Sequence, residues 1–173
     1  MFAENTDLNS WEPPTKMPFE IFSLTRDDLL DWVHLHYLAF DPLLPSLYTS
    51  PPSEESFARL ARDRLKALEF PSASIFKAMD TDTNKIIGVA YWKIYTSERT
   101  MEEVESEFVL PDPQPETRVE VRNGKWAGIW ASRCEVMGGT PHVLLESLAV
   151  LPEYQRQGVG TTLVQWGVDQ ANK

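Results

Sequence analysis

The apolar and polar positions of this chain follow two different periods in separate segments. Short apolar runs predict strands over residues 19–24, 74–79, 85–95 and 142–150. Apolar residues at helical spacing predict helices over residues 25–40 and 54–68 and a final helix over 158–172. The apolar residues of 85–95 do not alternate, which indicates a strand covered on both faces. The pattern therefore predicts a mixed α/β fold with a central sheet.

Local signals place the ends of several elements. Thr25 and Asp28 have the spacing of a capping box at the start of the first helix. Ser53 is positioned to cap the second helix. Gly88, inside the third strand, indicates a bulge or a close approach of another backbone.

The segment 97–141 differs from the rest of the chain. It begins with an acidic run from Glu98 to Glu107. The glutamates at 102 to 107 could attract a cationic amine, but we interpret them mainly as a solvated helical face. A proline-rich loop follows, and residues 116–137 are predicted to form a helix. Trp126 and Trp130 lie one helical turn apart, so they either line an aromatic pocket or, as such pairs more often do, belong to the core.

Composition limits the classes of function. A chain of 173 residues suggests one domain, here residues 19–173 after an irregular, proline-containing lead over 1–18. The net charge of −10 argues against nucleic-acid binding. No run is long and apolar enough for a membrane span, and the start does not resemble a signal peptide. With a single cysteine, Cys134, we expect a reducing, cytoplasmic location.

The histidines give no metal-ligand pattern. His34 and His36 are two residues apart on a predicted helix, so they point to different faces and cannot chelate one ion. His142 has no partner at ligand spacing, and we therefore predict no metal site.

The most informative motif lies at the end of the fourth predicted strand. An apolar run from Leu144 to Leu151 leads into the loop Gln155–Gly160, and the final helix begins there. Glycines at a helix N-terminus allow a phosphate to approach free backbone N–H groups. The loop lacks the lysine of a P-loop and the third glycine of a dinucleotide-binding loop. A different phosphate ligand is therefore indicated.

This motif resembles the acetyl-CoA loop of the Gcn5-related N-acetyltransferase (GNAT) superfamily. That loop reads Arg or Gln, two residues, Gly, one residue, then Gly or Ala, and here Gln155, Gly158 and Gly160 match it. Leu148-Ala149-Val150, Pro152 and Tyr154 match the family's usual approach to the loop. Tyr154 itself is interpreted as a packing residue.

The resemblance implies a GNAT-like fold, with segment 97–141 as a cap insertion over the acceptor site. Family members continue after the final helix with further strands, so the fold is expected to lack its C-terminal strands here. The edge left by a sheet that stops at its fourth strand predicts homodimerisation or association with a missing C-terminal segment.

The resemblance also implies site residues. Glu146, which interrupts an apolar strand, is the candidate general base, with a structural pairing to an arginine or a backbone donor as the equal alternative. The residues expected to bind acetyl-CoA are Leu148, Ala149 and Val150 on the strand and Gln155, Arg156, Gln157, Gly158, Val159, Gly160 and Thr161 in the loop.

The implied activity is transfer of acetyl from acetyl-CoA to an amine, by direct attack in a ternary complex. We expect a small-molecule acceptor, because no peptide groove is evident in the sequence. The alternatives are a protein N-terminal or lysine acetyltransferase and a CoA-binding module without catalysis.

Overall fold

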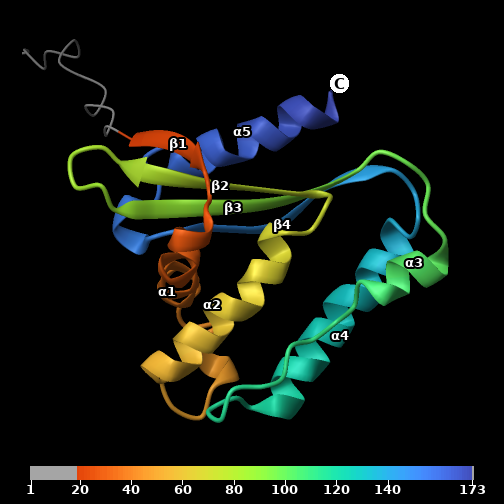
Figure 1. The fold of residues 1–173 in the computed structure, drawn as a ribbon, viewed down its shortest axis with the longest axis horizontal. Helices are drawn as coiled ribbons and strands as arrows, with labels where there is room; N and C mark the ends of the chain where they lie inside the picture. Colours follow the sequence, from red (N-terminus) through yellow and green to blue (C-terminus); the bar gives the residue numbers. More distant parts are fainter. Residues whose placement is uncertain (1–18, 173) are drawn as a thin grey trace, which may run out of the picture.

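The computed structural model describes residues 19–172, so the lead predicted over 1–18 lies outside the described residues. Its centre is a four-stranded antiparallel sheet in the order β1-β2-β3-β4 (Figure 1). The strands are β1 Phe19–Ser23, β2 Ala73–Asp80, β3 Ile86–Tyr95 and β4 His142–Val150. All four predicted strands are confirmed, and so is the mixed α/β class of the fold.

Helices cover both faces of the sheet. The helices are α1 Leu29–Ala39, α2 Glu54–Leu68, α3 Met101–Ser106, α4 Val119–Val136 and α5 Val159–Ala171. Helices α1 and α2 lie on one face and α5 lies on the other, whereas α3 and α4 stand apart from the sheet (Figure 1). Single turns of 3₁₀ helix occur at Arg26–Asp28, Pro45–Leu47 and Pro152–Tyr154.

The predicted first helix begins with one of these 3₁₀ turns. Thr25 and Asp28 form the expected capping box there, with the Thr25 backbone N donating to Asp28 Oδ2 over 2.7 Å. The α-helix proper starts only at Leu29. The capping prediction is thus confirmed, and the regular helix is shorter than its pattern suggested.

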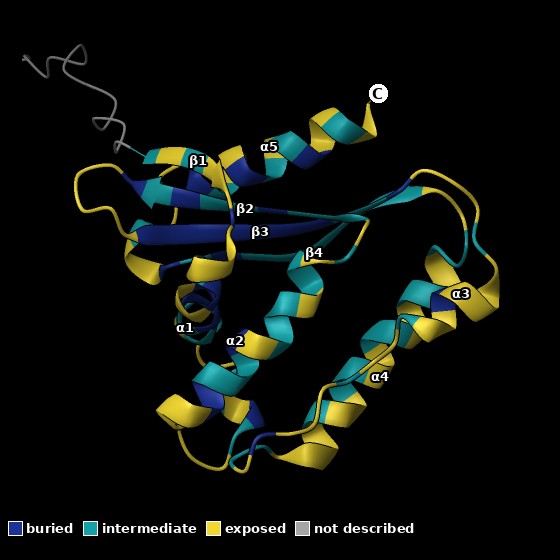
Figure 2. Cartoon of the chain, in the orientation of Figure 1, coloured by how far each residue is buried: buried dark blue, intermediate teal, exposed yellow. Residues whose placement is uncertain are grey.

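Two apolar clusters hold the helices on the sheet, with β3 buried between them (Figure 2). Trp32 of α1 packs with Val89 and Tyr91 of β3 on one face. Ala90 and Trp92 pack with α5 on the other face. A Cβ on Gly88 would lie 3.0 Å from the Val159 side chain and 3.3 Å from Ala149 O, and the register of β2 against β3 shifts beside Gly88, so both a close backbone approach and a bulge occur there.

The pairing of β3 with β4 is irregular at one position. Tyr91 pairs with Ser147 and Trp92 pairs with Leu145, so Glu146 has no partner in the register. This extra residue is a β-bulge, a feature that bends a strand and redirects a side chain. The bulge therefore sets the direction of Glu146.

No helix within residues 19–172 is both long and apolar enough to cross a bilayer.

Candidate functional site

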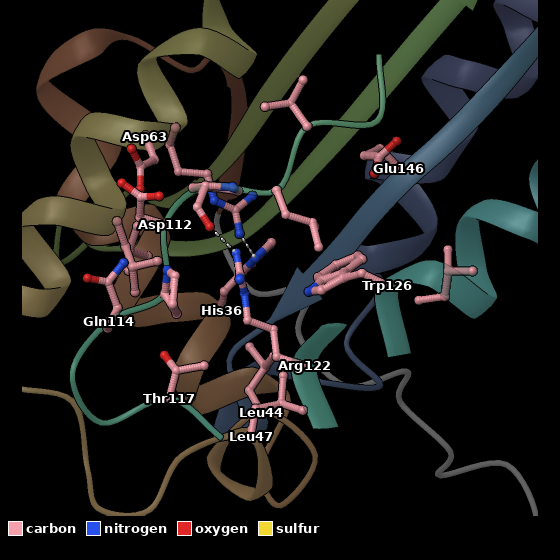
Figure 3. A pocket seen from close by; sticks show the side chains of 18 of the residues that line it. His36, Leu44, Leu47, Asp63, Asp112, Gln114, Thr117, Arg122, Trp126 and Glu146 are labelled. Carbon is pink, nitrogen blue, oxygen red and sulfur yellow. Dashed lines mark hydrogen bonds between the residues drawn. The ribbon is translucent and has the colours of Figure 1, made fainter. Parts of the chain in front are cut away.

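A pocket of about 350 Å³ lies between the face of the sheet that carries α1 and α2 and the inner side of α4 (Figure 3). Its walls come from five parts of the chain: α1, the loop before α2, α2, the middle of β3 and β4, and segment 97–141. The lining residues used below are His36, Asp63, Arg64, Lys93, Glu107, Gln114, Trp126, Trp130, Arg133 and Glu146.

Glu146 lies in this pocket and is held by Arg133 of α4. Arg133 NH1 donates to Oε2 over 2.8 Å, and NH2 donates to Oε1 over 3.0 Å. The Glu146 side chain is only 18% exposed. Such fork-to-fork pairs fix the orientation of both groups. The arginine pairing considered from the sequence is therefore present, and it occurs inside a cavity.

A second carboxylate continues this network. Lys93 Nζ lies 3.6 Å from Glu107 Oε2 and 4.0 Å from Glu146 Oε2. Glu107 also accepts hydrogen bonds of 2.6 Å from the Tyr95 hydroxyl and from Arg99 NH1. Burial and the Glu107 carboxylate raise the pKa of Tyr95. The expectation that the whole acidic run is solvated is wrong for Glu107, whose side chain is 14% exposed.

His36 and Arg64 meet at another wall of the pocket. His36 Nε2 lies 3.1 Å from Trp32 Nε1, and His36 Nδ1 lies 3.1 Å from Arg64 NH2. The Arg64 guanidinium also lies 4.3 Å from the centre of the Trp32 ring. Burial, with the charge of Arg64, holds the pKa of His36 well below its usual value, so the imidazole is neutral.

Two polar atoms of the pocket lack partners among the described residues. Asp63 Oδ2 and Gln114 Oε1 are buried and accept no hydrogen bond there. Buried acceptors of this kind are uncommon and often belong to ligand sites.

Trp126 and Trp130 line the same pocket. The interpretation of this pair as core residues is therefore wrong, and no residue of α4 is buried.

The glycine loop lies at the end of β4, where α5 begins. Gly158 caps α5 with φ of 89°, and Arg156 has φ of 60°. Gly158 has no side chain, and a Cβ there would meet no atom within 4 Å. No side chain of the described residues caps the N-terminus of α5. The first N–H groups of this helix are therefore available to an anion.

The outer edge of β4 adds backbone groups to this region. Leu151 N donates to Ile87 O on the β3 side, so the polar backbone groups of Val150 point the other way. Gln155 Nε2 reaches back to Val150 O over 3.1 Å. The backbone N–H and C=O groups of Leu148, two residues earlier, point to the same outer side as those of Val150. The backbone groups of Ala149 point toward β3.

The structure thus places the predicted residues in two neighbouring groups along β4. Glu146 faces the pocket, and Leu148 to Val150 lead to the loop of Gln155, Arg156, Gln157, Gly158, Val159, Gly160 and Thr161. Tyr154 packs against both core clusters, as expected for a packing residue.

Sequence reasoning missed Arg64, Lys93 and Glu107, because only the folded chain brings them to the pocket. Among the described residues, no three His, Cys, Asp or Glu side chains gather at a spacing suited to a metal ion.

In this structure a strand leads through a glycine loop into an uncapped helix, and a carboxylate on the same strand faces a pocket. This is the arrangement of a CoA-dependent acyltransferase. The family described as Acetyltransferase (GNAT) family matches residues 37–173, and the chain belongs to it. The protein is therefore a GNAT-type N-acetyltransferase, with acetyl-CoA as its co-substrate.

Solved structures share this fold. A transcriptional regulator from Bacillus halodurans C-125 is 15% identical with a TM-score of 0.54, and the match covers 90% of this chain and 75% of that one. A mosquito arylalkylamine N-acetyltransferase, like 5b, is 18% identical with a TM-score of 0.54, over 90% and 71% of the two chains. The search of curated proteins found no match.

Proposed function

We propose that this enzyme acetylates a small-molecule amine bound in the pocket, with Glu146 as the general base. The observation that carries the proposal is the position of Glu146 on β4. Its carboxylate faces the pocket, and the same strand continues within a few residues to the glycine loop. A base and an acetyl donor held along one strand would lie on either side of the attacking nitrogen.

The residues at the end of β4 fit acetyl-CoA. The backbone N–H groups from Gly158 to Thr161 would hold the pyrophosphate at the uncapped start of α5. The open space beside Gly158 leaves room for this approach. The outward backbone of Leu148 and Val150 would pair with the pantetheine arm, while Ala149 keeps β4 on the sheet. When bound, acetyl-CoA supplies the activated acetyl thioester.

The chemistry assigned to the chain itself is proton removal and positioning. An ammonium group has no free electron pair, so an amine must lose a proton before it attacks. Glu146 would take that proton, directly or through a water molecule. The fork of Arg133 leaves further lone pairs on both carboxylate oxygens, so the pairing fixes Glu146 without blocking it.

Segment 97–141 supports a small acceptor over a peptide. Its helix α4 forms one wall of the pocket, and its preceding loop is fastened to the other side. Thr117 makes a bridge with Tyr48, and Glu116 accepts hydrogen bonds from Ser53 N over 3.0 Å and from Ser56 Oγ over 2.7 Å. These contacts attach the loop before α4 to the start of α2, and the pair of Arg133 and Glu146 attaches α4 itself to β4. A volume of about 350 Å³ lies in the range of small-ligand sites.

A screen of acceptors tests this function. Release of the CoA thiol would be followed with acetyl-CoA and a panel of primary amines, amino acids, histone-tail peptides and N-terminal peptides. We expect turnover with one or more small amines and background rates with the peptides. Saturable turnover with peptides alone would favour a protein acetyltransferase. Acetyl-CoA binding without turnover on any acceptor would favour a non-catalytic module.

A further inference from the structure

We propose that the acceptor carries a carboxylate in addition to its amine, and that this carboxylate binds the guanidinium of Arg64. The inference rests on the function proposed above and names the class of its substrate. It starts from a guanidinium on the pocket wall that forms no ion pair with any acidic side chain of the described residues, although the Glu146 carboxylate acts on it from a greater distance.

Arg64 stands out among the basic groups of the pocket. Arg133 is paired with Glu146, and Lys93 lies between Glu107 and Glu146. No acidic side chain within residues 19–172 forms an ion pair with Arg64, including its neighbour Asp63.

Arg122, the remaining basic group of the wall, donates from NH2 to Pro111 O over 2.6 Å. Arg122 forms no ion pair within residues 19–172 either, but the backbone of the loop before α4 accepts from its guanidinium. Burial lowers the pKa of Arg64 and so disfavours its charge, and the nearby Glu146 carboxylate offsets this only in part.

The protein groups that contact Arg64 satisfy it poorly. Within residues 19–172 its one hydrogen-bond contact is His36 Nδ1, and the guanidinium also lies over the face of Trp32. Trp32 Nε1–H points at the other ring nitrogen of His36. Both neighbours of His36 can only donate, and a neutral imidazole has a single acceptor nitrogen. In either tautomer one donor faces an N–H, so the contact network is incomplete without a ligand.

A carboxylate on the bound acceptor would complete the contacts of Arg64. An arginine fork matches the two oxygens of a carboxylate, and the bond would draw the guanidinium away from the conflict at His36. A partly buried cation without an ion-pair partner costs stability, which a bound anion would recover. Arg64 and Glu146 line the same cavity, so one molecule can present a carboxylate to the first and an amine to the second.

The walls of the cavity describe the body between these two groups. Trp126 and Trp130 come from α4, and Phe57 and Leu60 come from α2. Aromatic and aliphatic walls favour an apolar or aromatic body. The acceptor class is therefore an amino acid, or an amine of the same design, with an apolar or aromatic side chain.

A binding experiment tests the carboxylate contact without any acetyl transfer. The probes are 3-phenylpropionate and 3-phenylpropanol, which share one body and differ in charge, and calorimetry on the full chain would give both Kd values. We expect the wild type to bind the carboxylate at least tenfold more tightly. Arg64→Met should abolish that preference, and Arg64→Lys should keep part of it.

The control variant is Arg59→Met on the same helix. Arg59 is outside the pocket wall. Its partner Asp112 belongs to the lining, but the Asp112 side chain is 90% exposed and the pair is 3.5 Å long, so this variant should retain the preference. The melting temperature of Arg64→Met should not fall, because the change removes a partly buried charge that has no ion-pair partner. A folding defect in Arg64→Met would leave Arg64→Lys to decide the question. A wild type that shows no preference for 3-phenylpropionate, or an Arg64→Met variant that retains it, would overturn the inference.

Kinetics separate this inference from the proposed function. With phenylalanine and phenethylamine as acceptors, kcat/KM should favour phenylalanine in the wild type and should lose that preference in Arg64→Met. Equal turnover of both amines would contradict the inference and leave the proposed function standing. If the protein prefers 3-phenylpropionate but turns over no amine, the inference about Arg64 would stand and the proposed function would be contradicted.

Discussion

The guanidinium of Arg133 holds both carboxylate oxygens of Glu146, at 2.8 and 3.0 Å, across the space between α4 and β4. This contact joins the segment proposed as a cap to the strand proposed to carry the base. It gives Arg133 a positioning role, because without it Glu146 is free to turn toward Lys93, 4.0 Å away.

Replacing Arg133 should therefore lower turnover. We expect Arg133→Met to reduce kcat by on the order of 10- to 100-fold, with a smaller change in KM for acetyl-CoA, since a misplaced catalytic group costs about this much. Arg133→Lys should recover part of the rate, and added guanidinium chloride should partly rescue Arg133→Met. The control is Arg118→Met at the exposed start of α4. Unchanged kcat in Arg133→Met would remove the positioning role.

The glycine loop can be tested with little disturbance of the fold. Gly158 has a left-handed backbone, which asparagine tolerates better than other side chains. Gly158→Asn would fill the open space beside the start of α5, and we expect the Kd of acetyl-CoA to rise by at least about tenfold, about 1.4 kcal/mol. Calorimetry would measure it.

The matched control is Gly138→Asn, a second glycine with positive φ that lies after α4 and outside the loop. This variant should bind acetyl-CoA with unchanged affinity. Equal affinity of Gly158→Asn and wild type would remove the loop from the CoA site.

The attachment of the proposed cap should depend on pH. Hydrogen bonds from Ser56 and from backbone N–H groups lower the pKa of Glu116 to about 2. A carboxylate whose pKa is lower in the folded state stabilises the fold above its unfolded pKa, and the contribution is lost as pH falls toward the folded value. Wild type should therefore be more stable than Glu116→Gln at pH 6, and the difference should shrink as the pH falls below about 4.5.

Urea unfolding at pH 6 and pH 3 would measure this difference. Other acidic groups such as Asp28 titrate in both proteins and cancel in the comparison. A difference in the free energy of unfolding that is the same at both pH values would contradict the role of Glu116.

The packing of α5 on the sheet gives a stability test. Gly167 lies directly on the ring of Trp92, and a Cβ there would overlap the ring. We expect Gly167→Ala to lower the free energy of unfolding by about 1–3 kcal/mol, a typical cost of overpacking. Gly128→Ala in α4, where a Cβ meets nothing within 4 Å, should instead stabilise by about 0.5–1 kcal/mol. Thermal and urea unfolding of both variants would check the contrast, and a neutral Gly167→Ala would contradict the packing.

The sequence predicted the sheet, its helices and the loop because each depends on local patterns. Periodicity marked the strands, and the spacing of Gln155, Gly158 and Gly160 marked the start of α5. The path of segment 97–141 depends on tertiary contacts, so the sequence could only favour a core position for Trp126 over the pocket that it lines.

The surroundings of charged side chains also depend on tertiary contacts, which the sequence alone does not reveal. Glu107 belongs to an acidic run and has the pattern of a solvated residue, yet Arg99 and Tyr95 enclose it. Arg64 lies on an amphipathic helix among other charged residues, with no local sign that it reaches a cavity. Glu146 was found because a charge within an apolar strand is unusual, but its arginine partner comes from another element.

The central claim is that Glu146 acts as the base for acetyl transfer in this pocket, and the pH dependence of kcat for Glu146→Gln tests it most directly. Glutamine can still accept from Arg133, so the pocket should keep its shape. With an amine from the screen, the variant should lose about 10²- to 10⁴-fold in kcat at neutral pH with unchanged affinity for acetyl-CoA. The loss should shrink at high pH, where the amine is already neutral. The exposed Glu69→Gln serves as the control. Full activity of Glu146→Gln at neutral pH would contradict the account.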